Sequence, residues 1–543
     1  MTNRSVDTNL ESLTNGAFLH LRKGDLREAE ILYKKILDQE PEHHEALFNM
    51  SQFLQLQGRA DEAKNYERQF LALGPGTSDV HIRMGRYLFA RDQCADALTN
   101  FQKAQALGDQ SLELHFSMSD VFLHLGNPVE AIKSCEMALK LAPDSATLFA
   151  LIAEAYRSLN RFDEALSYAR KAIAIQPDLT YSHCTIAWTL LLHGDYVTGL
   201  PLNEKRFNAR GREQLLILGI VPNIEKLFVK PFWQGELLQG KTILIWTEQG
   251  MGDNIMMMRY LLLLKEKGAG SIIVYSHQSL VKIMLTMTGL VVSTQVELSP
   301  AVFDLHCSMM SLPYLFGTSL QTIPADVPYL HCPPAMTKKW CTQLKKFDGL
   351  KVGIAWAGSK SQGKDQLRSV ALERFAPLVA VENVQFVSLQ KDAAMLQLKG
   401  KEWPILDWMD ICEDFLDTAA LMGNLDLIIC VDTAIVHLAG ALGKPVWLLN
   451  RFESEWRWMI DREDSPWYPT MRIFRQPTMH DWDSVMKTVA FELEKLASGQ
   501  EIKAISSEQW KKAARAADRA LGIDKNKAKM QTRWGKLSTL WRR

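Results

Sequence analysis

The chain has 543 residues, 47% of them hydrophobic and 23% charged, which gives enough apolar material for two or three buried cores and excludes a disordered or collagen-like protein. Lysine plus arginine and aspartate plus glutamate both number 62, which excludes a global charge that would draw the whole protein to nucleic acid. The first residues lack the basic and apolar segments of a secretory signal, and no apolar run is long enough to span a bilayer, so we expect a cytoplasmic protein without a transmembrane helix.

Three kinds of residue recur every 34 positions in the first part of the chain. A small residue lets the two helices of a hairpin approach closely, glycine serves the turn between them, and proline ends the second helix. This pattern resembles that of tetratricopeptide repeats and predicts six of them over residues 1–209, an α-solenoid with a concave groove. The series are Ala29, Ala63, Ala97, Ala131 and Ala165, continued by Gly199; Gly24, Gly58, Gly126 and Gly194; and Pro41, Pro75, Pro143 and Pro177.

One position per repeat is expected to face this groove, and the first three repeats place Asn15, Asn49 and Arg83 there. Their side chains are able to hydrogen-bond the backbone or a carboxylate of a bound peptide. Two interpretations stay open. The groove binds a protein acceptor, or these are solvated polar residues on an exposed helix face.

After about residue 210 the period stops, and short β-branched runs alternate with amphipathic helical segments. This alternation predicts parallel sheets, with ligands at the carboxyl ends of the strands. A proline-rich link near residues 324–334 separates two sets of strands, which predicts two Rossmann-like lobes across a cleft, over residues 210–335 and 336–500. The expected strands are residues 242–246, 271–275 and 302–306 in the first lobe, and 351–356, 385–389, 427–430 and 445–449 in the second.

A glycine-containing polar loop follows the first expected strand. It leads into a helix, and its glycines let a ligand approach the backbone. Asp253 is either a residue that caps this helix or a carboxylate that takes part in chemistry. The loop and helix residues that we expect on the acceptor side of the cleft are Glu248, Gln249, Gly250, Gly252 and Arg259.

A second polar turn follows the strand at 427–430 and contains Asp432, Thr433 and Ala434. The helix that begins there offers free amides and the positive end of its dipole, which suit a diphosphate, and Thr433 adds a hydroxyl. His437 lies one turn into the helix, where it either reaches the phosphate or fills the core.

A third loop follows the strand at 351–356 and is rich in glycine, serine and cations. Gly358, Ser359 and Lys360 lie early in it, and Arg368 lies at the edge of the next helix. Positive charge here suits a departing diphosphate. For Lys360 and Lys364 the alternative is a solvated charged loop, so Arg368 is the stronger candidate for binding the donor.

These three loops, EQGMGD at 248–253, WAGS at 356–359 and VDTAIVHLAGALGKPVW at 431–447, resemble those of the heptosyltransferase family, glycosyltransferase family 9. The order of repeats and lobes is similar to that of the protein O-linked N-acetylglucosamine transferases. The resemblance implies a GT-B fold, with a nucleotide-sugar donor in the second lobe and the acceptor in the first. It makes Asp253 the general base, and Asp432, Thr433 and His437 the donor-binding turn. Ala434 stands where heptosyltransferases usually have glycine, and this departure argues against heptose as the donor sugar.

The chemistry expected of these residues needs no metal or other cofactor beyond the nucleotide-sugar co-substrate. A hydroxyl attacks the anomeric carbon, a carboxylate takes its proton, and cations stabilise the leaving nucleotide. Asp481-Trp482-Asp483 has the DxD pattern of metal-dependent glycosyltransferases, but it precedes a helix expected over 484–496. We therefore interpret it as a capped helix start.

The last segment, residues 501–543, is basic and amphipathic, and it either packs on the lobes or makes a peripheral contact with an anionic membrane. The leading hypothesis is a glycosyltransferase whose protein acceptor is recruited by the repeats, with flagellin or another surface protein as the client by family analogy. One alternative is a transferase for a lipid-linked or lipopolysaccharide acceptor. Another is a non-catalytic adaptor with a vestigial sugar-nucleotide domain.

Overall fold

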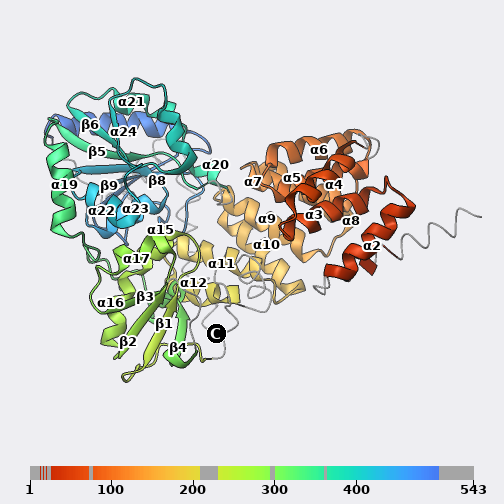
Figure 1. Cartoon of the computed structure of the whole chain (residues 1–543), viewed down its shortest axis with the longest axis horizontal. Coiled ribbons are helices and arrows are strands. Elements are labelled where there is room, and N and C mark those ends of the chain that lie inside the picture. Colours follow the sequence, from red (N-terminus) through yellow and green to blue (C-terminus); the bar gives the residue numbers. More distant parts are fainter. Residues whose placement is uncertain are drawn as a thin grey trace, which may run out of the picture. The chain divides into compact units, whose positions relative to one another are not determined.

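The computed structural model describes residues 26–72, 78–207, 230–293, 300–359 and 364–500, together with residues 13, 16, 17 and 20 (Figure 1). Asn15, Lys360 and residues 501–543 lie outside the described residues. The chain divides into two compact units, one ending at Pro143 and the other beginning at Asp144. Within the described ranges, no helix combines the length and apolar character needed to cross a bilayer.

The first unit is made of paired antiparallel helices, as tetratricopeptide repeats require. The five alanines of the 34-residue series are all buried, which explains the need for a small side chain where two helices touch. The helices are α2 (Leu26–Gln39), α3 (His44–Leu56), α4 (Ala60–Ala72), α5 (Ser78–Ala90), α6 (Cys94–Ala106), α7 (Leu112–His124) and α8 (Pro128–Leu141).

In each repeat whose internal turn the structure describes, one fixed position has a left-handed residue. Glycine fills it at Gly58, Gly126 and Gly194, with φ of 75°, 73° and 83°. Asp92 and Asn160 fill the same position at φ of 62° and 56°. Aspartate and asparagine tolerate this conformation better than other side chains, so the glycine series tolerates these two exceptions.

The second unit begins with two further helix pairs, α9 (Ala146–Ser158) with α10 (Phe162–Ile175) and α11 (Thr180–Leu192) with α12 (Tyr196–Asn203), followed by the 3₁₀ helix η1 (Glu204–Phe207). Phe162, Leu191, Tyr196 and Leu200 from these helices belong to one continuous apolar core with both lobes. On α12, a Cβ at Gly199 would lie 2.7 Å from Cγ of Leu191, so glycine replaces alanine there. The last repeats are thus part of the same folded body as the lobes.

The first lobe contains a parallel sheet in the order β3-β2-β1-β4. Its strands are β1 (Thr242–Trp246), β2 (Ser271–Tyr275), β3 (Leu290–Ser293) and β4 (Leu305–Ser308), with helices α15 (Met251–Met257), α16 (Arg259–Glu266), α17 (Gln278–Met284) and α18 (Leu312–Leu315). The predictions for β1 and β2 are confirmed, whereas the strand predicted at 302–306 begins three residues later. Asp304 accepts a hydrogen bond from the Thr242 amide (2.8 Å) and precedes the strand.

The second lobe contains a parallel sheet in the order β10-β9-β8-β5-β6-β7. Each strand predicted there is confirmed to within one residue, while β7 and β10 were not predicted. Asp481 caps α24 and accepts a hydrogen bond from the Ser484 amide (3.1 Å), so the capped helix start is confirmed. The elements are β5 (Leu350–Ala355), β6 (Val384–Ser388), β7 (Ile405–Asp407), β8 (Leu427–Val431), β9 (Val446–Asn450), β10 (Met471–Arg475), α19 (Pro334–Leu344), α20 (Asp365–Arg368), α21 (Ala376–Val379), α22 (Phe415–Met422), α23 (Ala434–Ala441) and α24 (Trp482–Ala497).

The strand order reverses between β1 and β4 in the first sheet and between β5 and β8 in the second. In open parallel sheets, ligands bind outside the carboxyl ends of the strands at such a reversal. The loops after β1, β5 and β8 are the three that the sequence singled out. The expected α-solenoid followed by two Rossmann-like lobes is confirmed, and the fold places all three loops where ligands bind.

Candidate functional site

The two lobes meet where α15 and α23 begin. A Cβ added to Gly252 on α15 would lie 2.6 Å from Cδ2 of His437 and 3.2 Å from Cα of Ala434, both on α23. These distances are shorter than ordinary contacts, so only glycine lets the two helices come this close. The loop after β1 and the turn after β8 therefore lie against each other.

Asp253 is the third residue of α15 and has two different partners. One carboxylate oxygen accepts a hydrogen bond from the Gly250 amide (2.9 Å), which closes the first turn of the helix. The other oxygen forms an ion pair with the Arg457 guanidinium. Burial raises the pKa of Asp253, and this effect outweighs the opposing charge of Arg457. A raised pKa brings a carboxylate closer to the range in which a general base works at neutral pH.

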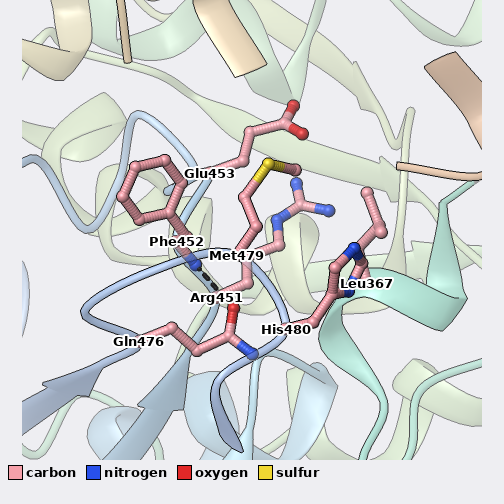
Figure 2. Close-up of a pocket in the computed structure, with 7 residues that line it drawn as sticks. All are labelled: Leu367, Arg451, Phe452, Glu453, Gln476, Met479 and His480. Carbon is pink, nitrogen blue, oxygen red and sulfur yellow. Dashed lines mark hydrogen bonds between the residues drawn. The ribbon is translucent and has the colours of Figure 1, made fainter. Parts of the chain in front are cut away.

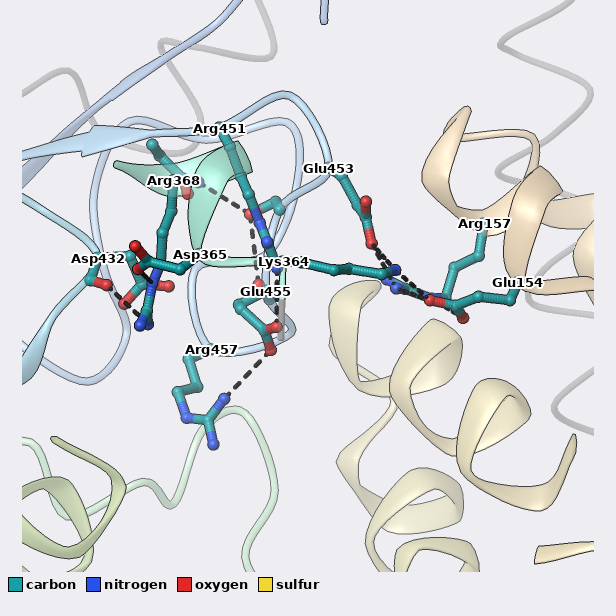
Figure 3. A network of polar contacts seen from close by, with 12 residues as sticks. Glu154, Arg157, Lys364, Asp365, Arg368, Asp432, Arg451, Glu453, Glu455 and Arg457 are labelled. Carbon is teal, nitrogen blue, oxygen red and sulfur yellow. Dashed lines mark hydrogen bonds and ion pairs between the residues drawn. The ribbon is translucent and has the colours of Figure 1, made fainter. Parts of the chain in front are cut away.

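The turn after β8 is bonded to the loop after β5 (Figure 3). Thr433 caps α23 by accepting a hydrogen bond from the Ile435 amide (3.2 Å). Arg368 donates from Nη1 to the Asp432 carbonyl (3.1 Å) and from Nε to the Asp365 carboxylate (2.9 Å). A Cβ at Gly358 would lie 2.5 Å from Nη2 of Arg368, so the glycine makes room for the guanidinium.

Asp432 itself is half-buried and lies near Glu455, an acidic residue of the loop after β9. Burial raises the pKa of its carboxyl, the nearby Glu455 raises it further, and Arg368 opposes both. Gly358, Arg368, Asp432 and Thr433 are thus brought together at the β5–β8 reversal.

The loop after β9 contributes two more buried arginines. Arg451 donates to Glu455 (3.0 Å), and Arg457 donates to the other oxygen of Glu455 (3.2 Å) and to Gln249 (3.3 Å). In the described part of the chain, the Nε atoms of Arg451 and Arg457 are buried and have no hydrogen-bond partner. Such donors are suited to an anionic ligand. Arg451 and Glu455 were not predicted, although a run of charged residues follows the predicted strand at 445–449.

His437 is buried in the contact between the lobes. Its Nδ1 lies 3.0 Å from the Tyr468 hydroxyl, and its ring stacks on that of Trp458 with 5.1 Å between the ring centroids. Burial lowers the pKa of His437 well below its usual value, and the charges of Arg457 and Arg259 act in the same direction. The imidazole is therefore neutral, and it packs between helices and aromatic rings.

Two residues expected on the acceptor side bond within the protein. Arg259 on α16 is buried and donates to the carbonyls of Trp467 (2.7 Å) and Pro324 (3.1 Å), which ties the first lobe to the second. Glu248 is also buried and pairs with Arg206 of η1 (2.7 Å) and with Ser308 at the end of β4. The structure brings Gly252 and Gln249 to the contact between the lobes, with Gly250 at the start of α15. Arg259 forms bonds that link the two lobes, and Glu248 bonds to η1 and to the end of β4.

A cavity of about 550 Å³ opens beside the loop after β5. This volume lies in the range typical of small-molecule sites, and the cavity lies at the carboxyl ends of β5 and β6. Its lining includes Gly358 and Ser359 from the loop after β5, and Asp392, Ala393, Ala394 and Gln397 from the segment after β6. Figure 2 shows a much smaller cavity of about 10 Å³ between Leu367, Arg451 and Gln476, where Gln476 accepts a hydrogen bond from the Phe452 amide (3.0 Å).

In the first unit, Asn49 and Arg83 occupy equivalent positions. Each is the sixth residue of the first helix in its repeat, α3 and α5, and each is half-buried. Arg83 donates from Nε to Asp79 (2.9 Å) one turn earlier on the same helix. The peptide-groove role of both residues stays a prediction.

Comparison with known proteins agrees with this arrangement. A family model described as glycosyltransferase family 9 (heptosyltransferase) matches residues 392–487, which include the turn after β8 and the loop after β9. Two models of tetratricopeptide repeats match residues 20–82 and 110–178. The resemblance expected from the three loops is confirmed. The chain has tetratricopeptide repeats followed by a glycosyltransferase family 9 domain.

Among curated proteins, the chain is 27% identical over 292 residues to protein FlbA of Caulobacter vibrioides, a match that covers 49% of this chain and 48% of that protein. The chain thus matches about half the length of this relative. Among solved structures, it is similar to MamA (22% identity, 31% of this chain and 92% of that one, TM-score 0.25). It is also similar to a tetratricopeptide repeat protein from Parabacteroides merdae (18% identity, 37% and 79%, TM-score 0.31).

Proposed function

We propose that this chain is a glycosyltransferase of the GT-B type that moves a sugar from a nucleotide-sugar donor to a hydroxyl of a protein bound by its repeats. The observation that carries the proposal is the contact of the loop before Asp253 with the turn that starts at Asp432, through Gly252 and His437. This contact brings the carboxylate of Asp253 in the first lobe close to the turn after β8 in the second lobe, which is of the kind that binds phosphate. A transferase needs both in one cleft.

The donor is a nucleoside phosphate sugar bound by the second lobe. Its nucleoside occupies the cavity beside Gly358 and Ser359, and its phosphates lie at the N-terminal end of α23, where the positive end of the helix dipole favours an anion. Arg368, Arg451 and Arg457 supply the positive charge that stabilises the leaving phosphate. With three arginines in this place, transfer proceeds without a metal ion.

Asp253 is the general base. It takes the proton of the acceptor hydroxyl while that oxygen forms its bond to the anomeric carbon and the bond from that carbon to the phosphate oxygen breaks. Two features support this role: Asp253 lies at the lobe contact, and burial raises the pKa of its carboxyl.

The first test is nucleotide binding. Calorimetric titration of the full chain with UDP, GDP, ADP, CDP and CMP is expected to show binding of at least one of them below millimolar concentration. Arg368→Gln is expected to weaken this binding by about 10- to 100-fold, because a hydrogen bond to a charged group is worth about 1.5–3 kcal/mol. Arg374→Gln is the matched control, since Arg374 is exposed and pairs with Asp483. Absence of binding by the wild-type chain would favour a vestigial domain.

The second test concerns the acceptor. Incubation with nucleotide sugars and cell lysate, followed by intact-mass analysis of proteins and lipids, is expected to show a sugar on a protein. The double variant Asn49→Ala/Arg83→Ala is expected to lower modification of that protein by about 5- to 150-fold, at roughly 0.5–1.5 kcal/mol per lost hydrogen bond, while donor hydrolysis by water continues. Modification confined to lipid would support the lipid-linked acceptor instead.

A further inference from the structure

A buried group of four charged residues connects a repeat helix to the donor lobe. Glu154 and Arg157 come from α9, Lys364 precedes α20, and Glu453 lies in the loop after β9. Lys364 donates to Glu154 (2.8 Å) and to Glu453 (3.3 Å), and Arg157 donates to Glu154 (2.7 Å) and to Glu453 (2.6 Å). Figure 3 shows these four side chains converging from the two sides. We call them the α9 tetrad.

The α9 tetrad is nearly closed to solvent. The side chains of Glu154 and Glu453 are each 4% exposed, Arg157 is 10% exposed and Lys364 is 18% exposed. Its two acids and two bases balance in charge. Burial alone would raise the pKa of Glu154, but the charges of Arg157 and Lys364 lower it well below its usual value. Burial also raises the pKa of Glu453, but the charges of Lys364 and Arg157 lower it below its usual value. Both acids are therefore ionised, and removal of one partner leaves an uncompensated buried charge.

Lys364 is the residue through which the tetrad reaches the donor site. Its backbone has φ of 65° and ψ of 19°, a left-handed conformation that few residues other than glycine adopt. Directly after it, α20 presents Asp365 and Arg368, and Arg368 bonds to the carbonyl of Asp432. The side-chain bonds of Lys364 and its backbone conformation together set where α20 begins.

We propose that Glu154 is a positioning residue of the donor site: through Lys364 it fixes α20, and thereby places Arg368 against the turn at Asp432. A residue of the repeats thus contributes to donor binding without touching the donor. The inference rests on the proposed function, since it assigns the nucleotide to this turn. In this proposal Lys364 does not contact the donor and acts through its ion pairs with Glu154 and Glu453.

The test compares a single and a double variant of the full chain. Glu154→Gln leaves one excess positive charge in the tetrad, so it is expected to lower both thermal stability and nucleotide affinity. Glu154→Gln/Lys364→Met leaves only the balanced pair of Arg157 and Glu453, so stability is expected to recover while affinity stays low. If α20 is correctly placed only about a tenth of the time, the Kd rises about 10-fold. Glu164→Gln is the matched control, because Glu164 forms an exposed pair with Arg161.

A second readout needs no nucleotide. The Leu367 amide donates to the Lys364 carbonyl (3.0 Å) and the Ser369 amide to the Asp365 carbonyl (2.8 Å). Hydrogen exchange at these two amides is expected to be about 10-fold faster in both variants than in the wild type. Should the single variant fail to fold, the charge-balanced double variant provides the same two measurements.

The outcomes separate this inference from the proposed function. A wild-type chain that binds none of UDP, GDP, ADP, CDP and CMP overturns both. If the wild type binds a nucleotide, three results overturn only the positioning role. The first is an affinity of Glu154→Gln that is unchanged or tighter, and the second is an affinity that recovers together with stability in the double variant. The third is unchanged hydrogen exchange at α20. Weaker binding in both variants with faster exchange at α20 supports it.

Discussion

Gly252 lies against the imidazole of His437 with no room for a side chain between them, since a Cβ would come within 2.6 Å of Cδ2. The ring has no free space to move into, because it is buried, stacks on Trp458 and bonds to Tyr468. The glycine of the first lobe and the histidine of the second thus set the separation of the two lobes at the cleft.

Gly252→Ala is expected to push α15 and α23 apart. Overpacking of this kind costs about 1–3 kcal/mol in the free energy of unfolding. A displacement of about 1 Å at a reacting group is expected to lower transfer by about 10²-fold. Thermal unfolding and the transfer rate measure the two effects. Gly16→Ala is the control, because among the described residues a Cβ there meets Leu32 at an ordinary 3.5 Å. Wild-type transfer by Gly252→Ala would show that the contact does not set the geometry.

Asp253→Asn is expected to lower transfer by about 10²- to 10⁴-fold while the protein stays folded. The raised pKa of Asp253 means that the fold favours the uncharged carboxyl, so a neutral amide is tolerated there. The amide oxygen also remains able to accept the hydrogen bond from the Gly250 amide. Transfer assays together with nucleotide titration distinguish a general base, whose loss lowers transfer alone, from a donor-binding residue, whose loss also weakens nucleotide binding. An unchanged transfer rate would remove Asp253 from the mechanism.

The pH dependence of transfer is expected to follow Asp253, which acts as a base only when ionised. Because burial raises the pKa of this carboxyl, the acidic limb of kcat/KM is expected above pH 3.8, the ordinary value for aspartate. The charge of Arg457 lowers the pKa of Asp253, so Arg457→Gln is expected to move the limb to higher pH. Arg374→Gln is expected to leave it in place. A limb that moves to lower pH in Arg457→Gln would contradict this assignment.

Sequence periodicity was sufficient to predict much of the fold. The alanine and glycine series reports a local requirement, a close helix contact or a left-handed turn, that recurs in every repeat. The strands β1 and β2 were predicted residue for residue because each is a short β-branched run bounded by polar residues. In contrast, β3 was not predicted, because it has only four residues, LVVS, and lies at a sheet edge.

The candidate site was predictable only where one loop contains several of its residues. Asp432 and Thr433 follow a buried strand directly, and this is a local signal. Glu154 and Lys364 are 210 positions apart, so no pattern within either segment predicts their ion pair. Arg259 shows the opposite problem. It lies next to the predicted loop in sequence, but its guanidinium turns to carbonyls of Pro324 and Trp467 that only the folded chain brings there.

The division of the chain at Pro143 leads to the last prediction, which concerns shortened chains. Removal of residues 1–209 would delete Phe162, Leu191, Tyr196 and Leu200 from the core that they share with the lobes, and it would delete two members of the α9 tetrad. Buried aromatic and leucine side chains each contribute about 1.5–3 kcal/mol, so the loss of these four is comparable to the total stability of an ordinary protein domain, about 5–15 kcal/mol.

A chain that starts at Asp144 retains that core and the α9 tetrad, and it is expected to fold. It is expected to bind nucleotide as tightly as the full chain, within about threefold, and to hydrolyse the donor slowly, because α9–α12 and both lobes are intact. Modification of the protein acceptor is expected to fall, since the groove position at Asn49 and Arg83 is gone. Thermal unfolding, nucleotide titration and intact-mass analysis of both shortened chains check these outcomes. If the chain that starts at residue 210 folds cooperatively and binds nucleotide like the full chain, the last repeats are dispensable to the lobes. If the chain that starts at Asp144 modifies the acceptor at the wild-type rate, acceptor choice belongs to the second unit.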